Sequence, residues 1–295
     1  MKFDAFEDYL KLERNYSPHT LKAYLTDLHD FSEYVLKEFE VEEIQNVSYS
    51  LIRSWIVHLV DQHISNRSIN RKISSLRSYY DFLLKSDQIE VSPLLKHRPL
   101  KTSKRLQVPF SEKEMEEALD LAVSEDFESV RDQFIVTLFY ATGIRRSELI
   151  NIQTDDLHPQ SRELKIRGKG NKERIIPLLP IVTERLEEYL KYRQQLEIIE
   201  DDSYLFLTKK GKKLYDVLVY RMINEYFRKI STKTKMSPHI LRHSFATHLL
   251  NQGADINSIK TLMGHESLTS TQIYTHNDIS FLKKIHGQAH PRNKK

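Results

Sequence analysis

Apolar residues recur at helical spacing along most of the first hundred residues. Ser17 and Pro18 form a typical helix start, an N-cap residue followed by proline at the first helical position. A second amphipathic stretch runs near residues 50–59, and a third begins near Ser68. The apolar positions of the first stretch are Leu21, Tyr24, Leu25, Leu28, Phe31 and Val35, and those of the third are Ile69, Ile73, Leu76, Tyr80 and Leu83. The pattern predicts an N-terminal bundle of about four helices.

Residues 96–109, KHRPLKTSKRLQVP, lack this periodicity. They include two prolines and six basic residues, His97 counted. We interpret this segment as a linker between a domain at residues 1–95 and a second domain at residues 110–295. A basic linker can follow a nucleic-acid backbone, although many such linkers are only solvated.

The second domain has a mixed pattern. Ser111 and Glu114 have the spacing of a capping box, which predicts a helix start. Residues 131–141 are typical of a buried helix, stopped by Gly143. The runs LKIR and ERII flank a glycine-rich turn and predict a β-hairpin over residues 163–177. A short strand and turn are expected over residues 204–214, with helices afterwards. The predicted fold is therefore mainly α with a small antiparallel β-sheet.

Composition narrows the class of protein. The chain has 295 residues, 39% hydrophobic and 29% charged, as ordinary globular proteins have. It lacks cysteine, which excludes disulfides and thiolate metal sites. No apolar run is long enough for a membrane span, and the acidic start MKFDAFEDYL does not resemble a signal peptide. We expect a cytoplasmic protein that does not contact a membrane.

Charge is distributed unevenly along the chain. Residues 1–65 carry six basic and twelve acidic side chains. By contrast, residues 66–105 carry ten basic and three acidic side chains, and residues 228–295 carry eleven basic and three acidic ones. Two separate basic blocks are compatible with a polyanion bound from two sides, or with two solvated surfaces.

The segment SPHILRHSFATHLL, residues 237–250, places cationic groups near a helix start. Ser237 and Pro238 open the helix, and His239, Arg242 and His243 fall on one face. Exposed N–H groups and the helix dipole favour a phosphate at such a position. By themselves these residues are better explained as capping and surface groups. A zinc site at His239 and His243 is also conceivable, although no third ligand and no catalytic Glu accompany them.

Two further segments have a similar character. In ATGIRRSELINI, residues 141–152, Gly143 breaks one helix and Ser147 can restart another, so that Arg145 lies at a turn suited to an anion or to pairing with Glu148. In MGHESLTSTQIYTH, residues 263–276, Gly264 ends a helix before His265, and Tyr274 follows nine residues later.

These motifs together resemble the tyrosine recombinases, the phage integrase family, from end to end. The shared segments GKGNKERIIPL, LRHSFATHLL and TQIYTH are long and specific, and SINRKISSLRSYYDFL is similar to the family's N-terminal core-binding domain. The bacterial Xer recombinases are the most similar subfamily, and the tail AHPRNKK resembles theirs. The resemblance assigns catalytic roles to Arg145, Lys169, His239, Arg242, His265 and Tyr274.

The resemblance implies a particular chemistry. Tyr274 attacks a DNA phosphodiester and forms a 3'-phosphotyrosyl intermediate, and paired strand exchanges pass through a Holliday junction. Arginine can bind phosphate oxygens bidentately, which suits Arg145 and Arg242. A histidine accepts the tyrosine proton, and Lys169 protonates the leaving oxygen. The phosphotyrosine bond conserves the energy of the broken strand, so that rejoining needs no ATP. No carboxylate cluster in the sequence demands a metal ion, and no cofactor is expected.

The resemblance also implies partners and a cellular role. It predicts a core-binding bundle and a catalytic domain that form a clamp on double-stranded DNA with a specific recombination site. We expect a homo- or hetero-tetramer with a related recombinase, with a DNA translocase as its activator, that resolves bacterial chromosome dimers at the nucleoid. The alternatives are an integrase of a mobile element, a type IB topoisomerase, and a DNA-binding protein without catalysis.

Basic side chains outside the catalytic set are candidates for DNA contacts. They lie on the polar face of the third helix, in the linker and in the hairpin turn. The candidates are Arg67, Arg71, Lys72, Arg77, Lys101, Lys104, Arg105 and Lys172.

Overall fold

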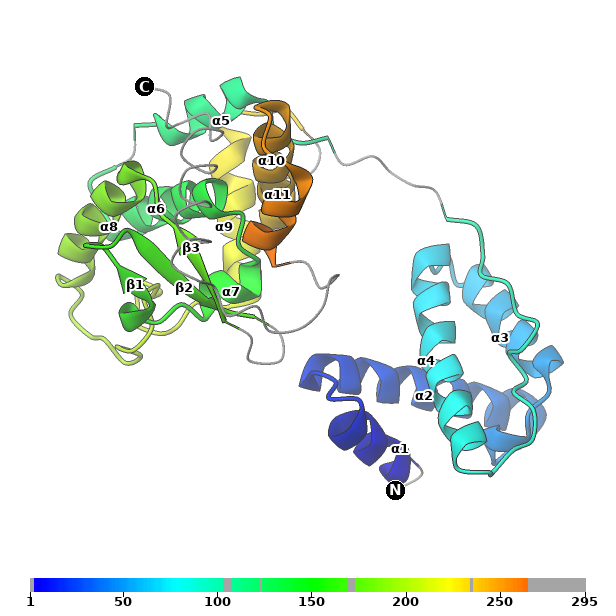
Figure 1. Cartoon of the computed structure of the whole chain (residues 1–295). Coiled ribbons are helices and arrows are strands. Elements are labelled where there is room, and N and C mark those ends of the chain that lie inside the picture. Colours follow the sequence, from blue (N-terminus) through cyan, green and yellow to red (C-terminus); the bar gives the residue numbers. More distant parts are fainter. Residues whose placement is uncertain (1–2, 103–107, 123, 169–172, 234–235, 265–295) are drawn as a thin grey trace. The chain divides into compact units, whose positions relative to one another are not determined.

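A computed structural model describes residues 3–102, 108–122, 124–168, 173–233 and 236–264. The chain divides into two compact units, Met1–Arg105 and Leu106–Lys295 (Figure 1).

The first unit is helical, as the apolar periodicity predicts. Ser17 caps the longest helix by accepting a hydrogen bond from the Thr20 N–H. Ser65 caps the last helix in the same way through the Ser68 N–H, so this helix begins at Asn66, slightly before the expected position. The elements are α1 (Asp4–Asp8), the π-helical turn η1 (Tyr9–Glu13), α2 (Pro18–Phe39), the 3-10 turn η2 (Ile44–Asn46), α3 (Tyr49–Asp61) and α4 (Asn66–Lys85).

Large aromatic side chains fill the core of this unit. The rings of Phe31 on α2 and Trp55 on α3 lie 5.0 Å apart, and both are buried. Tyr80 on α4 is also buried, and its hydroxyl donates to the Ile44 carbonyl at 2.7 Å. The three long helices therefore share one core, with the polar end of Tyr80 satisfied by main chain.

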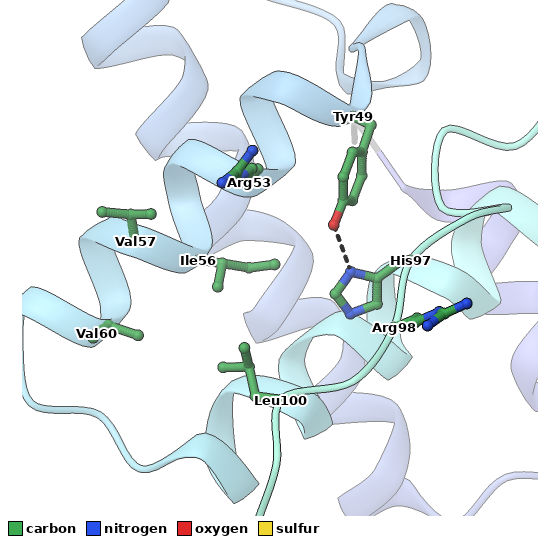
Figure 2. A pocket seen from close by; sticks show the side chains of 8 residues that line it. All are labelled: Tyr49, Arg53, Ile56, Val57, Val60, His97, Arg98 and Leu100. Carbon is green, nitrogen blue, oxygen red and sulfur yellow. Dashed lines mark hydrogen bonds between the residues drawn. The ribbon is translucent and has the colours of Figure 1, made fainter.

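The start of the expected linker packs on the first unit. Asn70 on α4 forms two hydrogen bonds of 2.9 Å with the main chain of Leu100. His97 is buried and shares a 3.1 Å hydrogen bond with the Tyr49 hydroxyl (Figure 2). Tyr49, Ile56 and Leu100 help to line a small cavity of about 280 Å³ at this place. Residues 96–101 are thus held by side chains of α3 and α4, and the boundary between the units follows Arg105.

The second unit combines helices with a small sheet. The strands are antiparallel in the order β1-β2-β3, and the predicted hairpin is confirmed, with Leu164 opposite Ile176. The elements are α5 (Glu112–Leu119), α6 (Phe127–Thr142), α7 (Arg146–Ile150), η3 (Thr154–Asp156), β1 (Leu157–His158), β2 (Glu163–Arg167), β3 (Glu173–Pro177), α8 (Pro180–Arg193), α9 (Asp216–Arg228), α10 (Pro238–Asn251) and α11 (Ile256–Met263).

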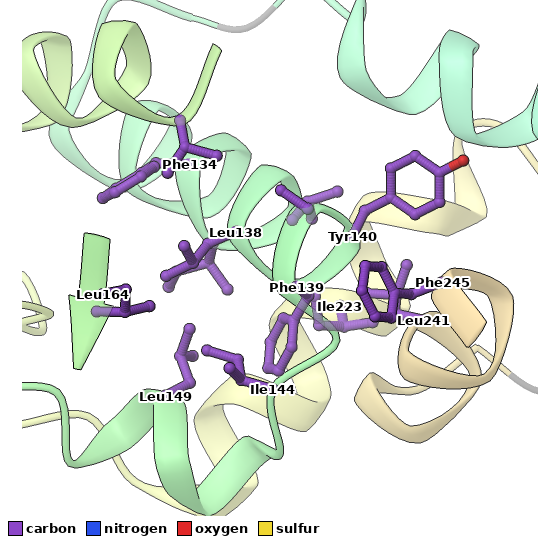
Figure 3. Close-up of a cluster of buried hydrophobic side chains, with 14 of the residues drawn as sticks. Phe134, Leu138, Phe139, Tyr140, Ile144, Leu149, Leu164, Ile223, Leu241 and Phe245 are labelled. Atoms are coloured by element: carbon purple, nitrogen blue, oxygen red, sulfur yellow. The ribbon is translucent and has the colours of Figure 1, made fainter. Parts of the chain in front are cut away.

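Helix α6 is the centre of this unit. Every residue from Gln133 to Thr142 is buried, because α5, α8, α9 and α10 all pack against the helix. Figure 3 shows part of this core, in which Phe139 and Tyr140 of α6 lie among side chains of other elements. A helix that is apolar on all sides is expected at the centre of a domain. The capping box of Ser111 and Glu114 is also confirmed at the start of α5.

The prediction of a strand within residues 204–214 is wrong. The segment makes only isolated bridges, Gln153 with Tyr204 and Leu207 with Lys213. Gly211 adopts φ +69°, and the Thr208 N–H donates to the Lys212 carbonyl at 2.7 Å, so the chain reverses too tightly for a regular ladder. Among the described residues, no helix is long and apolar enough to cross a membrane.

Candidate active site

Arg145 occupies the turn between α6 and α7. Gly143 ends α6 in the left-handed region, with φ +60°, and an added Cβ would lie 2.3 Å from the ring of Phe245. Glycine is therefore required there by conformation and by space. Arg145 follows as the N-cap of α7 in an extended conformation, and its side chain is 41% exposed. The helix restarts at Arg146, one residue before the expected Ser147.

Glu148 is the buried carboxylate that holds Arg145. It accepts hydrogen bonds from the Arg145 main-chain N–H at 2.8 Å and from Arg145 Nη1 at 2.9 Å. Arg174 on β3 donates to both oxygens of the same carboxylate, each at 2.9 Å. Burial opposes ionisation of Glu148, but the hydrogen bonds and charge of Arg174, together with the bonds from Arg145, outweigh it and lower the pKa of this carboxyl.

Arg242 reaches the same place from α10. Ser237 caps this helix through the Ile240 N–H, which confirms the expected start, and Arg242 lies buried in its second turn. Its guanidinium donates from Nη1 to the Gly143 carbonyl and from Nη2 to the Met263 carbonyl, the latter at 2.6 Å. Burial and the neighbouring charge of Arg145 lower the pKa of Arg242 to about 10, so the group remains protonated at neutral pH.

The guanidinium groups meet at the C-terminal end of α11. Consecutive carbonyls there accept from different arginines, Leu262 from Arg174 Nε at 3.1 Å and Gly264 from Arg145 Nη2 at 2.8 Å, with Met263 bound by Arg242 between them. The carbonyl end of a helix carries partial negative charge, which favours cations. The arrangement places Arg145 and Arg242 on neighbouring carbonyls directly before His265.

The histidines of α10 differ in environment. His239 and His243 are exposed in the first part of the helix. By contrast, His248 is buried between the Tyr140 hydroxyl and the Phe110 carbonyl, each at 2.8 Å. Burial lowers the pKa of His248, which fits a structural hydrogen-bonding role. No group of three potential metal ligands lies together in the described part of the chain.

Three predicted catalytic residues lie outside the described residues: Lys169, His265 and Tyr274. The strands on either side of Lys169 are nevertheless defined, with Arg167 opposite Glu173 at the end of the ladder. Lys104, Arg105 and Lys172, candidates for DNA contacts, also fall outside the described residues.

The other DNA-contact candidates are not equivalent. Asp27 on α2 is 1% exposed and accepts two hydrogen bonds from Arg71, at 2.5 and 2.8 Å, and one from Lys72 at 3.1 Å. Lys72 also pairs with Asp30. Arg67, Arg77 and Lys101 are exposed, as Arg71 is, and Arg77 lies 3.5 Å from the His97 carbonyl. The positive charges of Arg71 and Lys72 are therefore partly committed to carboxylates.

Comparison with known proteins identifies the family. The model of the phage integrase family matches residues 108–280, and that of the phage integrase N-terminal SAM-like domain matches residues 3–87. The chain belongs to the phage integrase family. It is 38% identical to tyrosine recombinase XerC of Staphylococcus aureus (strain USA300 / TCH1516) over 293 residues, 99% of this chain and 97% of the relative. Tyrosine recombinase XerC of Staphylococcus haemolyticus is 36% identical over 291 residues.

Solved structures agree on the fold of this recombinase. The XerH site-specific recombinase bound to palindromic difH substrate has a TM-score of 0.70 and 22% identity, covering 94% of this chain and 82% of that one. The predicted fold class, mainly α with a small antiparallel sheet, is confirmed, as is the expected activity of a site-specific tyrosine recombinase that cleaves and rejoins DNA.

Sequence reasoning missed part of the site of this recombinase. The pairing of Arg145 with Glu148 could be anticipated from their spacing of three residues. Arg174 could not, because it lies 26 residues from Glu148 and 88 residues from Leu262. Asp27, which binds Arg71 from 44 positions away, was missed for the same reason.

Proposed function

We propose that the cleavage centre of this recombinase consists of the six motif residues Arg145, Lys169, His239, Arg242, His265 and Tyr274. The observation that supports this most strongly is the meeting of Arg145 and Arg242 at the end of α11. These arginines come from motifs about a hundred positions apart, yet they bind the adjacent carbonyls of Gly264 and Met263. Such an arrangement suits a single anion better than two unrelated ion pairs.

The two arginines stabilise the charge that develops on the phosphate. Attack by Tyr274 on the phosphorus adds negative charge to the non-bridging oxygens while the bond to the 5' oxygen breaks. Donors fixed beforehand by carbonyls need little reorganisation in the transition state, and this is the largest contribution expected in such a site. An approaching phosphodiester favours the protonated form of Arg242, which counteracts the lowering of its pKa by burial.

Proton transfers complete the two steps. Tyr274 must lose its proton as the phosphotyrosyl bond forms, and a neutral histidine, His265 or His239, accepts it. The departing 5' oxygen must gain a proton, which Lys169 supplies from the turn between β2 and β3. The product is a 3'-phosphotyrosyl link and a free 5' hydroxyl. Reversal of these steps with a 5' hydroxyl from another strand rejoins the DNA.

In the cell, we propose, the protein resolves chromosome dimers at the nucleoid in the cytoplasm. It acts there as a tetramer with identical or related subunits on two copies of one recombination site, and a DNA translocase activates it. Similarity to tyrosine recombinase XerC over 99% of the chain supports this role. Sequencing of DNA covalently trapped on the protein in cells tests it. One chromosomal site is expected, whereas the ends of a mobile element would contradict the proposal.

Substitution of the nucleophile tests the chemical part of the proposal. On a nicked duplex that cannot be rejoined, the wild-type protein should accumulate a covalent adduct. Tyr274→Phe should bind the same duplex but form no adduct, and the matched control Tyr215→Phe, at an exposed tyrosine, should react normally. An adduct that persists in Tyr274→Phe would refute the assignment.

A further inference from the structure

Arg174 is a buried cation at a position where an apolar side chain would be expected. It lies on β3 opposite Ile166, and its neighbour on the same face of the strand, Ile176, is fully buried. Only 8% of the Arg174 side chain is exposed. A buried guanidinium is costly unless charged and polar partners satisfy it, and an apolar residue of similar volume often stabilises a fold as well or better. Stability alone therefore does not account for an arginine at this position.

The donors of Arg174 are divided between two elements. Nη1 and Nη2 bind the two oxygens of Glu148 at the start of α7, while Nε binds the Leu262 carbonyl at the end of α11. One planar guanidinium thus fixes β3, α7 and α11 to one another. Lysine could not reproduce this, because a single ammonium lacks the rigid fork of donors.

Two groups orient Arg145: Arg174 binds one of them directly, and the other lies two residues from a carbonyl that Arg174 binds. Both arginines bind the carboxylate of Glu148. Its Oε1 atom accepts hydrogen bonds from Nη1 of Arg145 and Nη1 of Arg174. Its Oε2 atom accepts from the main-chain N–H of Arg145 and from Nη2 of Arg174. The second acceptor of Arg145 is the Gly264 carbonyl, two residues beyond the Leu262 carbonyl that Arg174 binds. The side chain of Arg145 is partly exposed, whereas that of Arg174 is buried.

We propose that Arg174 is a positioning residue for DNA cleavage: through Glu148 and the end of α11 it holds Arg145 in the orientation that binds the scissile phosphate, without touching DNA itself. The inference rests on the proposed role of Arg145 at the phosphate. It adds a link between this arginine and the strand that follows the Lys169 turn, so that the hairpin and the phosphate-binding arginine share one anchor.

The test compares two substrates that differ in charge. A nicked duplex carries either an ordinary phosphate or a methylphosphonate at the scissile position. The methylphosphonate has one charged oxygen fewer and needs less help from an arginine. Arg174→Met should slow cleavage of the phosphate substrate about 10- to 100-fold through misplacement of Arg145, and its deficit relative to wild type should shrink on the methylphosphonate. DNA affinity should stay close to that of wild type.

Arg193→Met is the matched control. Arg193 is also buried, and it binds Asp202 and main-chain carbonyls, but none of its hydrogen bonds reaches Glu148 or α11. Any decrease in the cleavage rate of this variant should be the same factor on both substrates, as expected if the substitution only reduces stability. Where Arg174→Met folds poorly, Arg174→Lys keeps the charge without the fork of donors and should show the same dependence on substrate.

A double variant separates this inference from the proposed function. When Arg145→Ala is already present, adding Arg174→Met should reduce the cleavage rate of the phosphate substrate little further. The effects of two substitutions are not additive when one residue acts through the other. Full additivity, or equal deficits of Arg174→Met on both substrates, would overturn the positioning role. Near wild-type cleavage by Arg145→Ala alone would instead overturn the assignment of Arg145 itself.

Discussion

At the scale of single residues, the site depends on guanidinium groups whose donors are partly bound by main-chain carbonyls. Arg242 is buried and binds carbonyls at Gly143 and Met263, while Arg145 leaves part of its side chain exposed. Neither arginine relies on a flexible surface carboxylate. If a phosphate binds here, as we propose, it meets donors that folding has already oriented, and little further ordering is needed on binding.

Removal of either arginine should affect the chemical step more than binding. Arg145→Ala and Arg242→Ala should each slow cleavage on the order of 10²-fold or more, because a fixed donor to the developing charge is lost. Single-turnover cleavage of a nicked duplex, beside a DNA-binding titration, measures the two effects. Arg146→Ala is the neighbouring control, since Arg146 pairs with Asp216. Cleavage near the wild-type rate in either variant would show that its arginine does not act on the phosphate.

The two arginines proposed to be catalytic could be found from the sequence because they lie within compact motifs with local helix signals. Gly143 and Ser237 mark helix boundaries that the structure confirms. The contacts of Arg174 and Asp27 could not be found, because they join residues far apart in the chain whose pairing depends on how the helices and strands pack. A single sequence holds no periodic pattern for such contacts.

At the scale of elements, local signals predicted helices and the hairpin well, and tertiary packing decided the rest. The capping residues Ser17 and Ser111 and the alternation in β2 and β3 each act within a few neighbours. Residues 96–101 instead owe their conformation to Asn70 and Tyr49, which are far away in sequence. The segment 204–214 is shaped by the turn at Gly211 more than by strand propensity.

Helix α4 allows a prediction about DNA affinity. Arg67 and Arg71 are both exposed, but Arg71 is held by the buried carboxylate of Asp27. Arg67→Ala should therefore weaken DNA binding and reduce the slope of log affinity against log salt by about one. Arg71→Ala should change this slope less. Fluorescence anisotropy titrations across a salt series measure both, and an equal or larger change for Arg71→Ala would contradict the difference in pairing.

Helix α5 allows a prediction about pH. Burial opposes ionisation of Glu114, but hydrogen bonds from Lys233, Ser111 and Ser231 lower its pKa to about 2. A lowered pKa contributes stability that is present above the unfolded value, near 4.3, and is lost as pH falls through the folded value.

Glu114→Gln should therefore reduce the free energy of unfolding by about 1 kcal/mol at neutral pH, and the difference from wild type should shrink as the pH falls from about 4 towards 2. Urea unfolding followed by circular dichroism, repeated at several pH values, measures this difference in the free energy of unfolding. The control is the exposed Glu116→Gln, which should be neutral. A deficit that stays constant across this pH range would contradict the ionic origin.

At the scale of the whole molecule, the two units carry different groups for the proposed reaction on DNA. The first presents basic residues on α4, and the second brings Arg145, Arg174 and Arg242 together at the end of α11. Each unit has its own core, so substitutions at the arginine site need not disturb the helical unit. Variants that cleave poorly should for this reason retain DNA binding.

Mapping of the covalent adduct identifies the residue that attacks DNA. The protein is incubated with a nicked duplex in EDTA and without ATP, then digested with trypsin and nuclease and analysed by mass spectrometry. Cleavage after Lys260 and Lys283 would release residues 261–283, in which Tyr274 is the only tyrosine. We predict a nucleotide attached to this peptide through its 3' phosphate. An adduct on a different peptide, or none without a divalent metal ion, would contradict cleavage by Tyr274 through a metal-independent phosphotyrosyl intermediate.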